Sequence, residues 1–257
     1  MSLFEISFLI TTAFIAGAVN AVAGGGTFFS FPALLAVGVP PVIANASNAV
    51  ALWPASLSSA WEYRRELALH KGNLAWLSGV SFIGGIGGGL LLLAIQEAVF
   101  TSLIPWLLLF ATLLFACSQP LKALRTRARG HFKLTSRGTR ALSTLAYLLV
   151  AIYGGFFGAG MGILLLAALS ISGHDDILVL NAFKNLLSAI IYSVAVATFI
   201  LANKVAWTQT LIMLIAATLG GYIGAVAARR IPQGWLRIGI IFIGFALSAI
   251  YFIKTYA

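Results

Sequence analysis

Charged residues are scarce in this chain, and their scarcity excludes a soluble protein. Of its 257 residues only 9% are charged, whereas 61% are hydrophobic. A soluble domain of this length needs far more polar surface to face water. The apolar residues form long runs and do not alternate with polar ones, which also excludes a transmembrane barrel. The composition therefore indicates a helical integral membrane protein.

Acidic residues are the rarest charges: there are 6 Asp and Glu against 16 Lys and Arg, and the net charge is +10. None of the acidic residues lies inside an apolar run. The basic residues gather in connections at 62–71, 119–140 and 229–237. This is the pattern of cytoplasmic loops under the positive-inside rule. The excess charge therefore predicts membrane orientation, and no nucleic-acid partner is expected.

Residues for metal, redox or covalent chemistry are missing or isolated. The single cysteine, Cys117, cannot form an internal disulfide and is interpreted as a small apolar core residue. His70, His131 and His174 lie apart, without the spacing of metal ligands. No Ser/His/Asp constellation is placed for nucleophilic catalysis, and no glycine cluster continues into the Gly-Lys-Ser/Thr of a nucleotide loop. We expect no enzyme, no catalytic residue, no cofactor and no metal.

The apolar residues form about eight segments of roughly the 20 residues needed to cross a bilayer. The first and fifth segments are too long for one plain helix. The prediction is an all-α polytopic membrane protein. The segments are 6–37, 42–61, 74–95, 99–118, 141–172, 177–202, 207–228 and 235–253.

The chain matches itself when it is shifted by 137 residues without gaps, so that Gly25 meets Gly162 and Asn48 meets Asn185. Shared Asn and Gly at one register indicate two homologous halves. We predict a first transmembrane repeat over 1–121, a basic cytoplasmic linker over 122–140 and a second repeat over 141–257. Internal repeats in a membrane protein commonly place a substrate path between the halves.

Both long segments carry a glycine cluster in the middle, at 23–26 and at 158–162. Glycine costs about 1 kcal/mol in a helix interior relative to alanine, so several together favour a break or a re-entrant turn. Broken helices at matching positions of two halves point to a transporter site. The alternative is that the glycines only let helices pack closely, which we favour for 84–87 and 220–224.

The orientation of the two halves depends on these breaks. Eight simple crossings make the halves parallel and leave Arg229, Arg230 and Arg237 outside. If each long segment turns back at its glycines, the repeats are inverted, and only Lys204 is left on the wrong side. The charges favour inverted repeats, and both arrangements stay open.

Lys184 is the one charged residue in the interior of an apolar run, since Arg237 lies at the start of the run 235–253. A central lysine costs about 2.5–3.5 kcal/mol on insertion scales, so it usually faces a cavity or a partner, although snorkelling to the interface is a competing explanation. No carboxylate lies inside a run to neutralise it, so substrate, backbone carbonyls or water must do so. Helix N-termini at the breaks would add positive partial charge. Lys184 is therefore a candidate anchor for an anion.

Uncharged donors accompany this lysine in both halves. Ser47 and Asn48 occupy in the first half the register of Lys184 and Asn185 in the second, and such side chains can donate to oxyanions. For Asn20, Asn45 and Asn181 an interhelical hydrogen bond explains the residue equally well. The candidate substrate-binding residues are Lys184, Asn185, Asn48, Ser47, Asn45, Asn181, Asn20, Gly24, Gly25, Gly26, Gly158, Gly160 and Gly162.

These motifs resemble the sulfite exporter TauE/SafE family of membrane permeases, over nearly the whole chain. The resemblance implies movement of sulfite, sulfonates or related sulfur-containing anions. The second half departs from this pattern because it lacks a proline at the register of Pro32. The matching stretches are 24–27, 32–35, 38–41 and 44–48 in the first half, and 154–162 and 181–185 in the second.

The combined expectation is a secondary transporter of a small anion, with sulfite, a sulfonate or a related anion as substrate, bound mid-membrane between the repeats. An anion-selective channel is the alternative. A membrane enzyme would need clustered titratable groups inside the runs, and none is found. Membrane lipid is an expected partner, the bacterial inner membrane the expected location, and a homodimer one option. Direction, coupling ion and exact substrate stay open.

Overall fold

The computed structural model describes residues 1–68, 74–128, 136–171, 177–227 and 233–256. Every regular element in these ranges is an α-helix. His70, His131 and His174 lie outside them. The helices are α1 (Leu3–Ala23), α2 (Thr27–Ala36), α3 (Pro41–Glu62), α4 (Arg64–Ala68), α5 (Leu74–Ala94), α6 (Glu97–Ala128), α7 (Ser136–Phe156), α8 (Met161–Ile171), α9 (Ile177–Leu201), α10 (Trp207–Ala227) and α11 (Gln233–Tyr256).

Among the described residues, six stretches are long and apolar enough to cross a membrane. They lie in α1, α5, α6, α9, α10 and α11. The expectation of about eight is met only in part, because α3 and α7 fall short. Asn and Ser residues make α3 too polar, and the apolar part of α7 is only Ser143–Phe156. The protein is nevertheless all-helical where it is described, as a polytopic membrane protein should be.

Helix boundaries follow the predicted segments closely, with one difference at the basic linker. Of the stretch predicted as a linker, 122–128 continues α6 and 136–140 begins α7, while 129–135 lies outside the described residues. Lys and Arg are good helix formers, which is why the basic stretch prolongs these helices. Cys117 is exposed on α6, so its interpretation as a core residue is wrong.

Both long segments break at their glycines. Gly24 ends α1 with φ of 78°, and α2 follows after only two more residues. Gly158 and Gly160 have φ of 79° and 71° between α7 and α8. This left-handed region suits glycine because it lacks a Cβ. The second half-helix forms without a proline, since its Leu- and Ala-rich sequence favours a helix.

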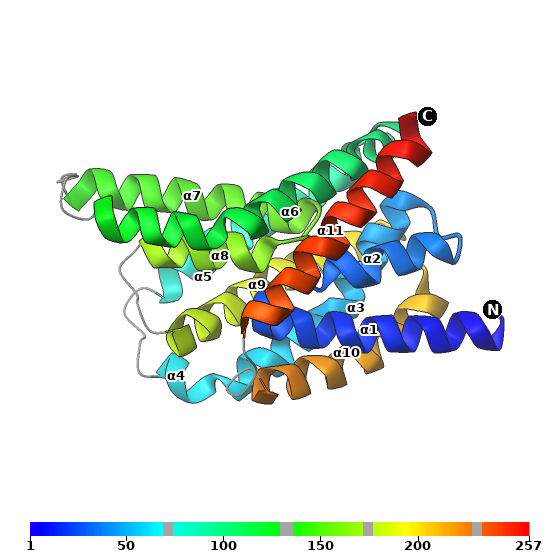
Figure 1. The fold of residues 1–257 in the computed structure, drawn as a ribbon, viewed down its shortest axis with the longest axis horizontal. Coiled ribbons are helices and arrows are strands. Elements are labelled where there is room, and N and C mark those ends of the chain that lie inside the picture. The colour runs from blue at the N-terminus through cyan, green and yellow to red at the C-terminus, as the bar shows by residue number, and fades with distance from the viewer. Residues whose placement is uncertain (69–73, 129–135, 172–176, 228–232, 257) are drawn as a thin grey trace.

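The two broken pairs run in opposite directions (Figure 1). The pair α1–α2 starts and returns at the end of the molecule where both chain termini lie, whereas α7–α8 starts and returns at the opposite end, near α4 (Figure 1). The later helices continue this opposition: α3 runs against α9, α5 against α10 and α6 against α11 (Figure 1).

The main contacts between helices occur in matching pairs. Where a helix of the first half packs on a helix of the second, the corresponding two helices with the halves swapped also pack together. Helix α1 packs along α10, and α7 packs along α5; α3 also packs on α10, and α9 on α5. The pairs α3–α9 and α6–α11 join like elements of the two halves. At the α3–α9 crossing, the indole Nε1 of Trp53 donates to the Ser193 hydroxyl at 2.7 Å.

Several glycines allow these helices to touch backbone to backbone. A Cβ built on Gly220 would lie 2.0 Å from the carbonyl oxygen of Phe14, and one on Gly84 would lie 2.4 Å from the Ala151 Cβ. The predicted packing role of 84–87 and 220–224 is thus confirmed at these positions. It is wrong for Gly87, where the nearest atom is 3.8 Å away.

We expect Gly220→Ala to lower the apparent melting temperature of the protein in detergent. The new methyl group must push α10 away from α1, and overpacking of this kind costs about 1–3 kcal/mol. The matched control is Gly79→Ala in α5, because nothing lies within 4 Å of that Cβ and alanine favours the helix. An unchanged melting temperature for Gly220→Ala would contradict the close α1–α10 contact.

Candidate functional site

The two helix breaks meet at glycine. A Cβ on Gly24 would lie 2.4 Å from the Cα of Gly162, and one on Gly162 would lie 2.5 Å from the Cα of Gly24. The same Cβ on Gly162 would lie 3.2 Å from Cδ of Lys184. The lysine stem therefore lies beside the point where the first break touches the start of α8.

Lys184 is buried, with 1% of its surface exposed, which contradicts the snorkelling alternative. Its Nζ donates to the carbonyl oxygens of Ala21 at 2.7 Å and Asn20 at 3.1 Å. Those carbonyls belong to the last turn of α1, where the helix dipole places negative partial charge. An ammonium has three donors, and the carbonyls engage two of them. Backbone carbonyls thus meet the charge, which is one of the three possibilities that the sequence left open.

No carboxylate among the described residues pairs with this ammonium. The acidic side chains that the structure describes lie at or near helix ends, as Glu5, Glu62, Glu66 and Glu97. A buried cation that has only neutral dipoles as partners is incompletely compensated. The protein's own dipoles therefore compensate the charge of Lys184 only in part.

The asparagines beside Lys184 hold unused acceptors. Asn185 donates from Nδ2 to the Ala21 carbonyl at 3.5 Å, while its Oδ1 has no hydrogen-bond partner. Asn181, one turn earlier on α9, is also buried with an unpartnered Oδ1. Asn20 donates from Nδ2 to the Ser56 hydroxyl at 3.2 Å, which is the interhelical bond that was its alternative explanation.

The first-half residues form a second polar cluster on α3. Asn48 donates from Nδ2 to the Thr27 hydroxyl at 3.3 Å, and its Oδ1 accepts from the Ser30 hydroxyl. These bonds tie α3 to the first turn of α2. Asn45 donates from Nδ2 to the carbonyl of Phe156 at 2.7 Å, at the end of α7.

The two clusters cross-connect the halves in the same way. On α9, Lys184 donates to the carbonyl end of α1; on α3, Asn45 donates to the carbonyl end of α7. Each third helix of one half thus holds the broken first helix of the other. Ser47 differs from Lys184, whose register it shares, because its hydroxyl accepts from the Ala206 amide at 2.8 Å and caps α10.

The remaining candidate glycines have separate neighbours. A Cβ on Gly26 would meet the Ala16 carbonyl at 2.3 Å, one on Gly158 the Tyr192 hydroxyl at 3.0 Å, and one on Gly160 the Ala111 Cβ at 3.3 Å. Gly25 is buried within the first break. The glycine clusters therefore shape the two breaks, and only Gly24 and Gly162 join them.

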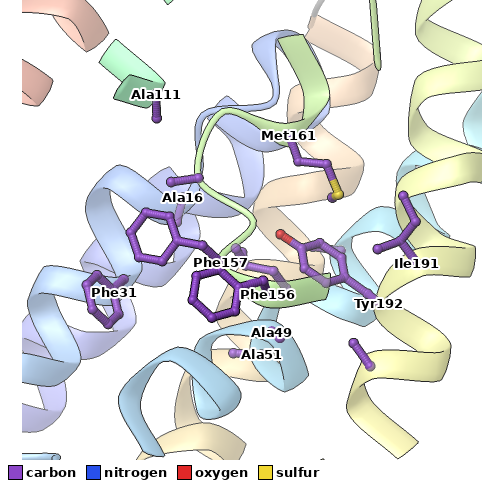
Figure 2. Packing of buried hydrophobic residues seen from close by; sticks show 14 of the residues in the cluster. Ala16, Phe31, Ala49, Ala51, Ala111, Phe156, Phe157, Met161, Ile191 and Tyr192 are labelled. Carbon is purple, nitrogen blue, oxygen red and sulfur yellow. The ribbon is translucent and has the colours of Figure 1, made fainter. Parts of the chain in front are cut away.

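Aromatic rings pack around the end of α7 (Figure 2). The ring of Phe157 packs edge-on against Phe31 of α2, with centroids 5.5 Å apart. The ring of Phe156 packs in the same way against Phe100 of α6 at 5.8 Å. This aromatic cluster leaves the second break covered by apolar side chains.

Sequence reasoning missed three polar residues at the breaks. Thr27 and Ser30 bond Asn48, and the position of Thr27 directly after a glycine cluster was a usable signal. The third is Tyr192, which is buried with an unpartnered hydroxyl. Its place two helical turns after Asn185 carried a weaker signal, because any aromatic residue fits an apolar run.

Comparisons with known proteins find one matching family and several relatives named as probable membrane transporters. The family model described as sulfite exporter TauE/SafE matches residues 9–251. A probable membrane transporter protein of Haemophilus influenzae is 26% identical over 251 residues, covering 95% of this chain and 93% of the relative. The probable membrane transporter protein YfcA of Escherichia coli strain K12 is 28% identical over 254 residues, covering 96% and 91%.

A third relative is the probable membrane transporter protein ORF9 of Sinorhizobium sp, which is 27% identical over 222 residues and covers 86% of this chain and 82% of itself. No solved structure matches the chain. The relatives are membrane transporters and not enzymes. With nearly its whole length matched, this multi-pass membrane protein belongs to the sulfite exporter TauE/SafE family.

Proposed function

We propose that this protein is a secondary transporter that moves a small sulfur-containing anion, such as sulfite or a sulfonate, across the bacterial inner membrane. The observation that carries the proposal is Lys184, a fully buried cation at the contact between two helix breaks, with no carboxylate partner among the described residues. The name of the matching family supports sulfur oxyanions as substrates.

Electrostatics favours an anion over a neutral or cationic substrate. An isolated charge inside a membrane protein is expensive, and such residues commonly mark ion or substrate pathways. The carbonyls of Asn20 and Ala21 offset part of this cost. An arriving anion can accept a hydrogen bond from the third N–H of the ammonium and supply the missing opposite charge. We therefore expect the anion to bind most strongly at Lys184.

The opposed helix directions support transport by two inverted halves. The α1–α2 pair enters from the end of the chain termini, and α7–α8 enters from the other end (Figure 1). Arg64 and Arg65 of α4 lie at that other end, which the positive-inside rule makes cytoplasmic. Rocking of one broken pair against the other would open the Lys184 site to each side in turn.

Backbone contact between the breaks favours a carrier over a channel. The approach of Gly24 to Gly162 leaves no room for a side chain, and the rings of Phe31, Phe100 and Phe157 cover the second break. A continuous pore would need an open path at this depth. An occluded centre is what alternating access requires between its two open states.

Anion binding is expected to raise the unfolding temperature of the purified protein in detergent. A ligand that binds only the folded state at 100 times its Kd stabilises by about 2.7 kcal/mol. The screen compares sulfite, methanesulfonate, taurine, sulfate and thiosulfate, with chloride and choline as controls. Stabilisation by sulfur anions and not by choline is the expected result.

Uptake measurements separate the carrier from its alternative. Proteoliposomes should accumulate the stabilising anion with saturable kinetics, and planar bilayers should show no unitary currents. Unitary anion currents would favour the channel. If no anion shifts the unfolding temperature or crosses the liposome membrane, the proposed function is wrong.

A further inference from the structure

Tyr192 is a buried polar residue that the Lys184 site does not use. It lies on α9, eight residues after Lys184, which places it about 12 Å further along the helix. Its side chain is 1% exposed, and its hydroxyl has no hydrogen-bond partner in the part of the chain that the structure describes. A buried tyrosine hydroxyl usually finds a partner, because losing water without replacement is costly. The unpaired donor therefore calls for an explanation.

The hydroxyl faces the break between α7 and α8. A Cβ on Gly158 would lie 3.0 Å from it, so only a glycine leaves space at this position. Figure 2 shows the Tyr192 ring reaching from α9 toward the connection between Phe157 and Met161. The side chain of Thr27 in α2 is close enough to interact with it, but no hydrogen bond of ordinary geometry joins the two hydroxyls.

Unused backbone donors line the same break. The amide of Met161 donates to the Gly158 carbonyl, and that of Ile163 to the Gly160 carbonyl. The amides of Ala159 and Gly160 donate to no acceptor among the described residues. These groups begin α8, an 11-residue helix whose N-terminus carries positive partial charge. Helix starts of this kind are favourable places for oxyanions.

We infer that the Tyr192 hydroxyl and the free amides of the α7–α8 break form a second oxyanion subsite, distinct from the Lys184 ammonium. The inference rests on the proposed function and extends it. The subsite recognises the sulfite or sulfonate head group by hydrogen bonds without a charged side chain. Helix α9 runs from the end near α4 toward the end of the chain termini (Figure 1). Tyr192 therefore lies further from the cytoplasm than Lys184, and the second subsite binds the anion on that side.

Two subsites suit a carrier better than one. A single buried ammonium that bound the anion tightly would release it slowly. A neutral donor set that includes Tyr192, two turns further along α9, offers a place for the anion after it leaves the charge. Thr27 brings the first half into the same subsite, since it lies close to Tyr192 and bonds Asn48.

The test is Tyr192→Phe, which removes one oxygen and keeps the ring. Sulfite and methanesulfonate affinity, measured by titration calorimetry in nanodiscs, should fall about ten- to hundredfold, the loss typical of one hydrogen bond to a charged group. The melting temperature of the ligand-free protein should stay the same or rise, because the hydroxyl has no partner to lose. A merely structural role would lower it.

The matched control is Tyr251→Phe, whose ring lines a lateral groove between α2 and α11. It should bind sulfite as the parent protein does. If Tyr192→Phe also binds sulfite with parental affinity while Lys184→Gln loses binding, the second subsite is wrong and the proposed function stands. If the parent protein binds no sulfur anion, the proposed function itself fails.

Discussion

Replacement of Lys184 by glutamine is expected to reduce sulfur-anion affinity at least about tenfold and to suppress uptake into proteoliposomes. Glutamine can still donate to the Ala21 carbonyl, so the end of α1 keeps one of its bonds. What disappears is the positive charge, and a hydrogen bond to a charged group contributes about 1.5–3 kcal/mol. Binding is measured by calorimetry in nanodiscs, and uptake with a labelled anion.

Lys204→Gln is the matched control, because this lysine is exposed in the connection between α9 and α10. The control should bind and transport as the parent does. The folded fraction of both variants is compared by gel filtration in detergent. If Lys184→Gln has unchanged flux and affinity, Lys184 does not bind the anion, whatever the control shows.

Substitution of Gly24 by alanine is expected to separate the two helix breaks. Gly24 has φ of 78°, where an alanine costs about 1–2 kcal/mol. In addition, its Cβ would collide with the Cα of Gly162 at 2.4 Å, so the two broken pairs must move apart. We expect a large drop in melting temperature and loss of transport in proteoliposomes.

Gly38→Ala isolates the backbone cost from the collision. Gly38 has φ of 82°, but no atom lies within 4 Å of its Cβ. This control should lose only the backbone contribution and keep transport activity. If the two variants lose equal stability, the contact between the breaks contributes nothing to stability, and the close approach of Gly24 to Gly162 is wrong.

Much of the helical layout could be predicted from local sequence. The runs 74–95, 177–202 and 207–228 correspond to α5, α9 and α10 within a residue or two, because an apolar run of this length has only a helix available in lipid. The glycine clusters likewise marked the ends of α1 and α7. Residues 122–128 and 136–140 of the basic stretch are helical, since Lys and Arg continue a helix as readily as they form a loop.

The candidate site was harder to predict, because its partners are far apart in the chain. Lys184 was identified as a buried charge, but its acceptors on Asn20 and Ala21 lie more than 160 residues away. Ser47 shares the register of Lys184, yet it caps α10 through Ala206. Nothing in a local pattern distinguishes a serine that caps a distant helix from one that faces a ligand.

By itself, the sequence determined that this protein crosses a membrane, where its helices lie and that two of its long segments break at glycine. These are consequences of composition and of backbone preferences over a few neighbouring residues. Only the tertiary structure decided that the breaks touch at Gly24 and Gly162, that the carbonyl end of α1 holds Lys184, and that Tyr192 has an unused hydroxyl. Those outcomes depend on how distant helices pack, because hydrogen-bond partners and close backbone approach are properties of the assembled bundle.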